Sequence, residues 1–282
     1  MARLLGLIAN RPDLCNRFVE YEKDALSLRQ PADETGQTQW GWGVGFFQSG
    51  ELLLKRRPLD DRRVLSPVDM VSDVRSDVLL CHVRLGTVGS FRTDNTHPFR
   101  YRQWMFADTG TVAGWGDIGG KLYETLPRFL QRSLRGDTDS EQLFHLFLSF
   151  LHDAGRLEHP MVAIGDVMSA LKSTLGLLDR LTKEANSGPT QMNIMLATPE
   201  YLVAVHRGAP MAYRVLKGRE DFEPLYAAED AGRLRMPDLE PCRLSAVASN
   251  FERDQIPPDW TAVPDGTMMA FTRTDEPVVV KP

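Results

Sequence analysis

The chain has 282 residues, of which 42% are hydrophobic and 25% are charged, and its formal net charge is −5. This composition is typical of a globular protein with a sizeable core and excludes fibrous and disordered chains. The acidic balance gives no electrostatic argument for a nucleic-acid or membrane partner. The apolar run at residues 4–9 is too short for a membrane span or a signal peptide, so we expect a cytoplasmic protein.

Cysteines and histidines show no spacing typical of a disulfide framework or a metal site. Cys15, Cys81 and Cys242 are far apart and odd in number. His145 and His152 lie on one predicted helix without an acidic or sulfur partner at ligand spacing. We therefore predict neither a metal nor a cofactor.

The first elements follow from apolar patterning. Residues 3–9 predict a buried strand at the very N-terminus, which would fix terminal residues that are otherwise loose. An amphipathic helix is expected over residues 13–29, and the polar residues 30–39 should form a loop. The basic clusters at residues 55–57 and 62–63 are interpreted as a solvated loop.

Two glycine-rich stretches need separate interpretations. Residues 40–47, WGWGVGFF, predict a strand with a bulge or a close backbone approach, followed by a hairpin turn at Ser49 and Gly50 and a returning strand at 51–55. Residues 114–119 match G-x-G-x-x-G, but the neighbouring patterns indicate antiparallel strands. A dinucleotide site is therefore disfavoured.

The second half alternates long helices with short strands. We expect one helix over residues 121–134, with a kink at Pro127. A second helix should begin at a capping box at residues 138–141, and a third should span residues 166–185. Strands are expected at 192–197, 201–205 and 211–215, joined by short turns as a meander, and at 244–249 and 268–271.

Polar residues are concentrated between residues 82 and 110, beside the strand-like runs 78–81 and 104–107. In this segment, Arg84 has the planar guanidinium that suits bidentate carboxylate recognition. On its residue type alone, a structural ion pair is the preferred alternative. Asp139, in the first turn of a predicted helix, could equally be an acid favoured by the helix dipole.

Several motifs occur in the order found in the class II glutamine amidotransferases, a branch of the N-terminal-nucleophile hydrolases, which the chain resembles. They are MARLLG at 1–6, GWGVG at 41–45, HVR at 82–84, NTHPF at 95–99, FADTG at 106–110 and TDSE at 138–141. The resemblance covers residues 1–271. It implies one domain over 1–282 and an α+β fold, a four-layer α/β/β/α sandwich of two mainly antiparallel sheets with helices outside.

The resemblance also implies which residues stand at the catalytic positions. Family members begin Met-Cys and use that cysteine as the nucleophile, whereas this chain has Ala2, which has no nucleophilic atom. The family's oxyanion-hole motif is Phe-Ala-His-Asn-Gly. Here Asp108 replaces the histidine and Thr109 replaces the asparagine, while Gly110 is kept. Loss of one oxyanion donor typically lowers the rate roughly a hundred- to thousandfold.

By the same resemblance, the ligand is glutamine or a γ-glutamyl compound. Arg84 is expected to pair with its α-carboxylate and Asp139 with its α-ammonium group. Thr87, His97 and Asp108 are assigned to the same substrate-binding site. We interpret His97 as a hydrogen-bonded histidine beside the pocket and not as an acid or base.

Three hypotheses follow. The leading one is a class II glutamine amidotransferase-like protein that is catalytically inactive but keeps its amino-acid-binding elements. The second is an active amidotransferase or γ-glutamyl amide hydrolase with an engineered Cys-to-Ala change at position 2. Asp108 and Thr109 argue against it, because one substitution would suffice to trap substrate. The third is a scaffold or regulatory protein that binds a protein partner and no small molecule.

Overall fold

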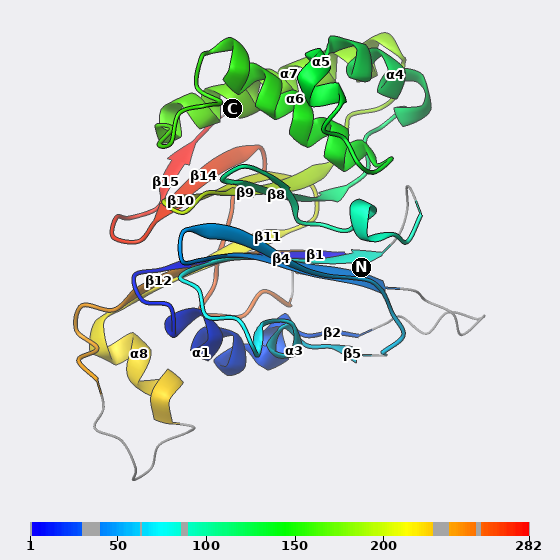
Figure 1. Cartoon of the computed structure of the whole chain (residues 1–282). Coiled ribbons are helices and arrows are strands. Elements are labelled where there is room, and N and C mark those ends of the chain that lie inside the picture. The colour runs from blue at the N-terminus through cyan, green and yellow to red at the C-terminus, as the bar shows by residue number, and fades with distance from the viewer. Residues whose placement is uncertain are drawn as a thin grey trace.

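A computed structural model describes residues 2–29, 40–62, 64–85, 90–227, 237–251 and 255–281. Within these ranges, two antiparallel sheets pack face to face between two layers of helices (Figure 1). Helices α4 to α7 cover the outer face of one sheet, and α1, α3 and α8 lie on the outer face of the other. The predicted α/β/β/α sandwich is therefore confirmed.

The larger sheet has seven strands in the order β13-β11-β12-β1-β6-β3-β4. Its central strand β1 pairs antiparallel with β12 on one side and β6 on the other, and every residue of β1 is buried. The first strand thus inserts into the sheet as predicted. The strands are β1 (Arg3–Ala9), β3 (Trp40–Gln48), β4 (Glu51–Asp60), β6 (Val78–Leu85), β11 (Met211–Lys217), β12 (Arg243–Ser249) and β13 (Thr261–Ala262).

The second sheet has six strands in the order β15-β14-β10-β9-β8-β7. They are β7 (Phe99–Tyr101), β8 (Trp104–Gly110), β9 (Met192–Ala197), β10 (Tyr201–Arg207), β14 (Thr267–Thr272) and β15 (Val278–Val280). A small antiparallel pair joins β2 (Leu28–Arg29) to β5 (Val64–Leu65).

Apolar side chains fill three layers. Leu4, Met105 and Leu202 belong to the cluster between the sheets, whereas Phe18 and Phe144 belong to the clusters between each sheet and its helices. No helix in the described ranges is long and apolar enough to cross a membrane. The helices are α1 (Leu14–Tyr21), α2 (Lys23–Leu26), α3 (Pro67–Val71), α4 (Trp115–Thr125), α5 (Arg128–Gln131), α6 (Asp139–Asp153), α7 (Ile164–Glu184) and α8 (Gly218–Ala227), with a 3₁₀ turn η1 at Thr93–Asn95.

The glycines of the GWGVG stretch allow the close approach that the sequence predicts. A Cβ atom on Gly43 would collide with the carbonyl oxygen of His97, and one on Gly45 would collide with the sulfur of Met105. The pairing of β3 with β4 also shifts register between Trp40 and Trp42, as in a bulge. Strand β3 can therefore lie directly against the segment that carries His97.

Two predicted helices have different bounds in the structure. The helix expected over 13–29 ends at Tyr21, and after the short α2 the chain enters β2. The helix expected over 121–134 already begins at Trp115 and is interrupted at Pro127, whose ring removes a backbone donor. Residues 30–39, expected to form a loop, lie outside the described residues.

The predicted meander over residues 192–215 is wrong. Strands β9 and β10 pair in the second sheet, but β11 crosses to the first sheet, where it pairs with β12 and β13. The second neighbour of β10 is β14. Short apolar runs joined by tight connections predict the strands correctly. The pattern does not distinguish a turn within one sheet from a crossing between two packed sheets.

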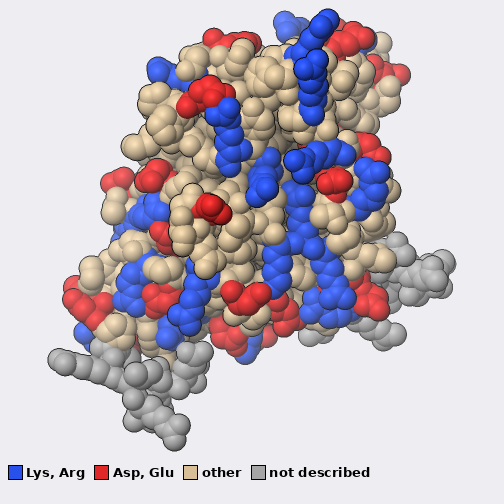
Figure 2. Space-filling view, in the orientation of Figure 1, with Lys and Arg blue, Asp and Glu red and all other residues tan. Residues whose placement is uncertain are grey.

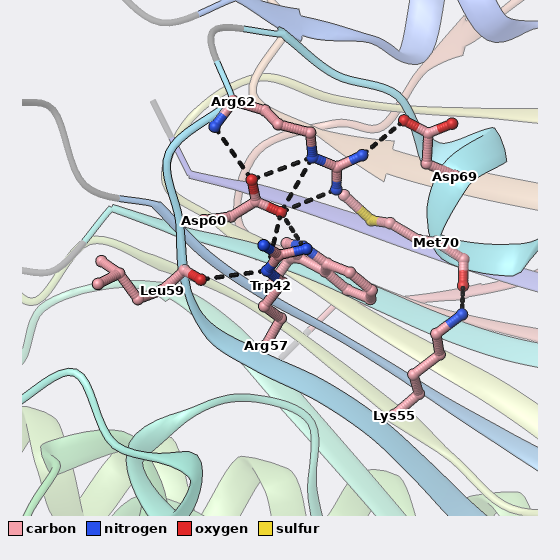
Figure 3. Close-up of polar contacts among 8 residues, drawn as sticks. All are labelled: Trp42, Lys55, Arg57, Leu59, Asp60, Arg62, Asp69 and Met70. Carbon is pink, nitrogen blue, oxygen red and sulfur yellow. Dashed lines mark hydrogen bonds and ion pairs between the residues drawn. The ribbon is translucent and has the colours of Figure 1, made fainter.

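The basic cluster at residues 55–57 is also misassigned, because it lies on strand β4 and not in a loop. At the end of this strand, the side chain of Asp60 is fully buried. Its carboxylate accepts hydrogen bonds from Trp42 Nε1 and Arg62 Nη2, each at 2.8 Å, and Arg62 also pairs with Asp69 on α3 (Figure 3). The network joins β3 and β4 to α3.

Burial alone would raise the pKa of Asp60, but the hydrogen bonds from Arg62 and Trp42 outweigh it and lower the pKa to about 2. Because this value is below that of an unfolded aspartate, the carboxylate stabilises the fold above about pH 4. That contribution is lost as the pH falls toward the folded pKa.

We expect Asp60→Asn to lower the free energy of unfolding by about 2 kcal/mol at neutral pH, and the deficit to shrink as the pH falls from about 4 to about 2. Urea unfolding of both proteins across this range measures the effect. Asp61→Asn is the matched control, since Asp61 is the exposed neighbour. A deficit that stays constant with pH would contradict this account.

Candidate functional site

The backbone and side chains around the chain start hold Ala2 in place at the end of β1. The N–H of Leu4 donates to Ser249 Oγ at 3.2 Å, and the side-chain amide of Asn250 donates to the carbonyl oxygen of Ala2. The guanidinium of Arg3 donates to two backbone carbonyls of α2. The second residue of the chain is therefore anchored, although chain termini are usually loose.

A small cavity of about 40 Å³ opens beside Ala2. It lies where β6 and β8, from different sheets, meet the N-terminus of α6. Each site residue predicted from the sequence lines this cavity except Thr87, which lies outside the described residues. The lining residues are Ala2, His82, Arg84, His97, Asp108, Thr109, Gly110, Thr138, Asp139 and Ser140.

Arg84 brings a buried positive charge to the cavity. Its Nη1 donates to the carbonyl oxygen of Asn95 at 3.0 Å and to that of Ser90 at 3.3 Å. Burial lowers the pKa of Arg84, against the opposing effect of the Asp139 and Asp137 carboxylates. An arginine remains protonated after such a shift, so the guanidinium stays cationic.

Asp139 supplies a carboxylate at the first turn of α6. Its Oδ2 accepts from the N–H of Val112 at 2.9 Å, and its Oδ1 accepts from the N–H of Ser140 at 3.1 Å. The preceding Thr138 caps the helix by accepting from the N–H of Glu141, as the capping-box pattern predicts. Burial, with a contribution from the Asp108 carboxylate, raises the pKa of Asp139 to about 6.

Asp108 and His97 form a buried pair beside these charges, with His97 Nε2 and Asp108 Oδ1 3.1 Å apart. Burial raises the pKa of Asp108 to about 7, against a hydrogen bond from Ser140. Burial and repulsion from Arg84 and Arg56 lower the pKa of His97 to about 3. Burial thus disfavours the charged form of each partner, which favours a neutral hydrogen bond over an ion pair.

Gly110 ends strand β8 in a conformation that only glycine fits well. Its φ angle is 129°, and a Cβ atom would collide with the carbonyl oxygen of Gln191, the residue directly before β9. The tight packing brings Thr109 to the cavity wall.

No group of three or more His, Cys, Asp or Glu side chains among the described residues is arranged to hold a metal ion.

Sequence reasoning missed three residues of the cavity wall, His82, Thr138 and Ser140. His82 lies two residues before Arg84 on β6, so strand alternation puts both side chains on the same face. Its ring centroid is 4.2 Å from that of His97. Thr138 and Ser140 flank Asp139 in the helix-capping motif. Their polar side chains beside a predicted site residue were the sequence signal that could have placed them in the cavity wall.

The sequence profile of the class II glutamine amidotransferases matches residues 1–281. The chain belongs to this family. Among known proteins, this family member is similar to the probable glutamine amidotransferase DUG3 of Saccharomyces cerevisiae. The two are 26% identical over 255 residues, which cover 83% of this chain and 69% of the yeast protein.

Solved structures show the same fold. A predicted glutamine amidotransferase from Pseudomonas aeruginosa matches with a TM-score of 0.59 at 20% identity, covering 97% of this chain and 98% of that one. The glutamine phosphoribosylpyrophosphate amidotransferase of Bacillus subtilis matches with a TM-score of 0.54 at 14% identity. That match covers 99% of this chain and 49% of the Bacillus chain. At these identities the likeness is one of fold.

The raised pKa of Asp108 predicts a specific pH dependence. Its neighbours are His97, Ser140 and the Asp139 carboxylate. For an acid whose folded pKa exceeds its unfolded value, the free energy of unfolding falls as the pH rises between the two. We expect Asp108→Asn to match the native protein near about pH 4 and to become progressively more stable than it up to about pH 7.

Urea unfolding of the two proteins at a series of pH values measures this difference. Asp265→Asn, at an exposed turn, is the control and should show no such trend. A stability difference between Asp108→Asn and the native protein that does not change with pH would mean that Asp108 is ionised in the fold throughout this range.

Proposed function

We propose that this class II glutamine amidotransferase-like protein binds the amino-acid head group of glutamine or a γ-glutamyl compound but does not hydrolyse the amide. The observation that carries the proposal is that Ala2 lines the same cavity as Arg84 and Asp139. The cavity thus combines charges suited to an amino acid with a methyl group at the anchored chain start.

The binding half of the proposal rests on charge complementarity. Arg84 and Asp139 come from different elements, β6 and α6, and the Asp139 carboxylate acts electrostatically on the Arg84 guanidinium. An α-carboxylate can pair with the guanidinium, and an α-ammonium group can pair with the carboxylate. Both charges of a free amino acid would then be matched in a buried setting, where unpaired charges are costly.

The loss of chemistry rests on the side chains at three family positions. The methyl group of Ala2 cannot form a covalent intermediate. The hydroxyl of Thr109 is shorter than the asparagine amide it replaces, and each missing oxyanion donor typically costs roughly a hundred- to thousandfold in rate. Above its pKa of about 7, Asp108 would also place a negative charge near a developing oxyanion.

A second candidate is a scaffold or regulatory protein that binds no small molecule. The size of the cavity favours it, because about 40 Å³ is far below the roughly 300–1,000 Å³ of ordinary ligand pockets. Under our leading proposal the cavity must widen when the amino acid binds.

Calorimetric titration with glutamine, glutamate and a γ-glutamyl dipeptide tests the proposal. We expect saturable binding that disappears in Arg84→Ala and in Asp139→Asn, but not in the surface control Asp265→Asn. Binding should be tighter above a pH of about 6, because Asp139 is then ionised and can pair with the α-ammonium group beside the cationic Arg84. No heat at millimolar ligand would reject the proposal and favour the scaffold.

The hypothesis of an engineered Cys-to-Ala change has its own test. We expect Ala2→Cys, with its mature N-terminus confirmed by mass spectrometry, to release no ammonia from glutamine at an enzymatic rate. Thr109 and Asp108 still weaken the oxyanion site in this variant. Ala2→Ser is the matched control for the added polar atom. Strong activity of Ala2→Cys would favour an engineered origin and an otherwise intact catalytic site.

A further inference from the structure

A second, much larger hollow lies between the edges of the two sheets. Its volume is about 1050 Å³. It is lined mainly by β4 and β7, which are the edge strands of the seven-stranded and the six-stranded sheet, and by residues of η1 and the start of α6. We call it the edge cleft. It shares no lining residue with the cavity beside Ala2.

The edge cleft is basic although the chain is acidic overall. Five basic residues line it, against the three acids Asp73, Asp94 and Glu141, in a chain whose net charge is −5. Lys and Arg side chains also gather in a band on the face shown in Figure 2, which runs from the helix layer down across the level of the sheets. The basic lining residues are Lys55, Arg56, Arg100, Arg102 and Arg135.

Two of these cations already have carboxylate partners. Lys55 pairs with Asp73, and Arg102 pairs with Glu158. Within the described ranges, no ion pair joins the other three arginines of the cleft to a carboxylate. Those three guanidinium groups are the cations that could face a ligand.

The guanidinium of Arg56 is a cation in an unfavourable environment. Its guanidinium donates to the carbonyl oxygens of Thr93 and Pro98, and its Nε is buried without a hydrogen-bond partner among the described residues. Burial and the nearby charges of Arg100 and Arg135 lower the pKa of Arg56 to about 10, although two acids of the cleft attract it. A bound anion would offset this burial and repulsion.

Glu141, one of the three acids of the cleft, is held by the backbone. Both carboxylate oxygens of Glu141 accept backbone N–H groups, from Arg135 at 3.1 Å and from Gly136 at 2.7 Å. The aromatic rings of Phe99 and Tyr101 add an apolar wall, and the Phe99 centroid lies 6.0 Å from the Arg56 guanidinium carbon. A ligand with both an anionic and an organic part would match this lining.

We propose that the edge cleft binds a phosphorylated small molecule. A phosphate group offers three acceptor oxygens and up to two negative charges, which suits several guanidinium groups better than a single carboxylate does. The volume of about 1050 Å³ is slightly above the roughly 300–1,000 Å³ of small-molecule pockets, so the cleft accommodates an organic part as well as the phosphate.

Calorimetric titration at low ionic strength, with inorganic pyrophosphate and with ribose 5-phosphate as probes, tests this proposal. We expect both to bind and ribose not to bind. Arg100→Gln and Arg135→Gln should each weaken binding about tenfold, as expected for a lost charge-assisted hydrogen bond. Both side chains are exposed, and thermal unfolding checks that the variants fold.

Arg132→Gln is the matched control, because it removes the same charge from an exposed position outside the cleft. Its affinity for pyrophosphate should equal that of the native protein. Absence of heat with both phosphorylated probes, or equal weakening by Arg132→Gln, overturns the proposal. Asp139→Asn should leave pyrophosphate binding unchanged, because Asp139 lines the cavity beside Ala2 and not the edge cleft. This test is therefore independent of the proposed amino-acid binding.

Discussion

The structure depends on the burial of the first strand. All seven residues of β1 are buried, and backbone hydrogen bonds to β12 and β6 fix it in the middle of the larger sheet. Because the strand begins at Arg3, residue 2 cannot move far from the ends of β6 and β8. The position of Ala2 in the cavity wall therefore follows from the packing of the sheet, and the chemistry at this position is set by one side chain.

Burial also decides the charge state of the cavity. The lowered pKa of His97 and the raised pKa values of Asp108 and Asp139 have the same main origin, which is the cost of an ionised group away from water. Only Arg84 keeps its charge at every pH of interest. The edge cleft contrasts with this cavity because it is much larger and two of its arginines, Arg100 and Arg135, are exposed to solvent.

Motifs predicted the fold and named most of the residues that line the cavity beside Ala2, whereas local patterns alone did not predict the connections between strands or the surface clefts. The HVR and FADTG motifs lie at strand ends, so their side chains converge when the sheets pack, as expected. The crossing of β11 to the other sheet had no local signal. The edge cleft could not be predicted because Arg56, Arg100 and Arg135 are far apart in sequence and meet only where two sheet edges align.

The measurement that tests the central claim most directly is ammonia release from glutamine by the purified native protein, after mass spectrometry has established that Ala2 is the first residue. The account predicts a rate no greater than that of a buffer blank, because under the proposed function Ala2 supplies no nucleophilic atom and Thr109 stands in the place of an oxyanion-hole amide. Ammonia release at an enzymatic rate that is abolished by Thr109→Val or Asp139→Asn would contradict it.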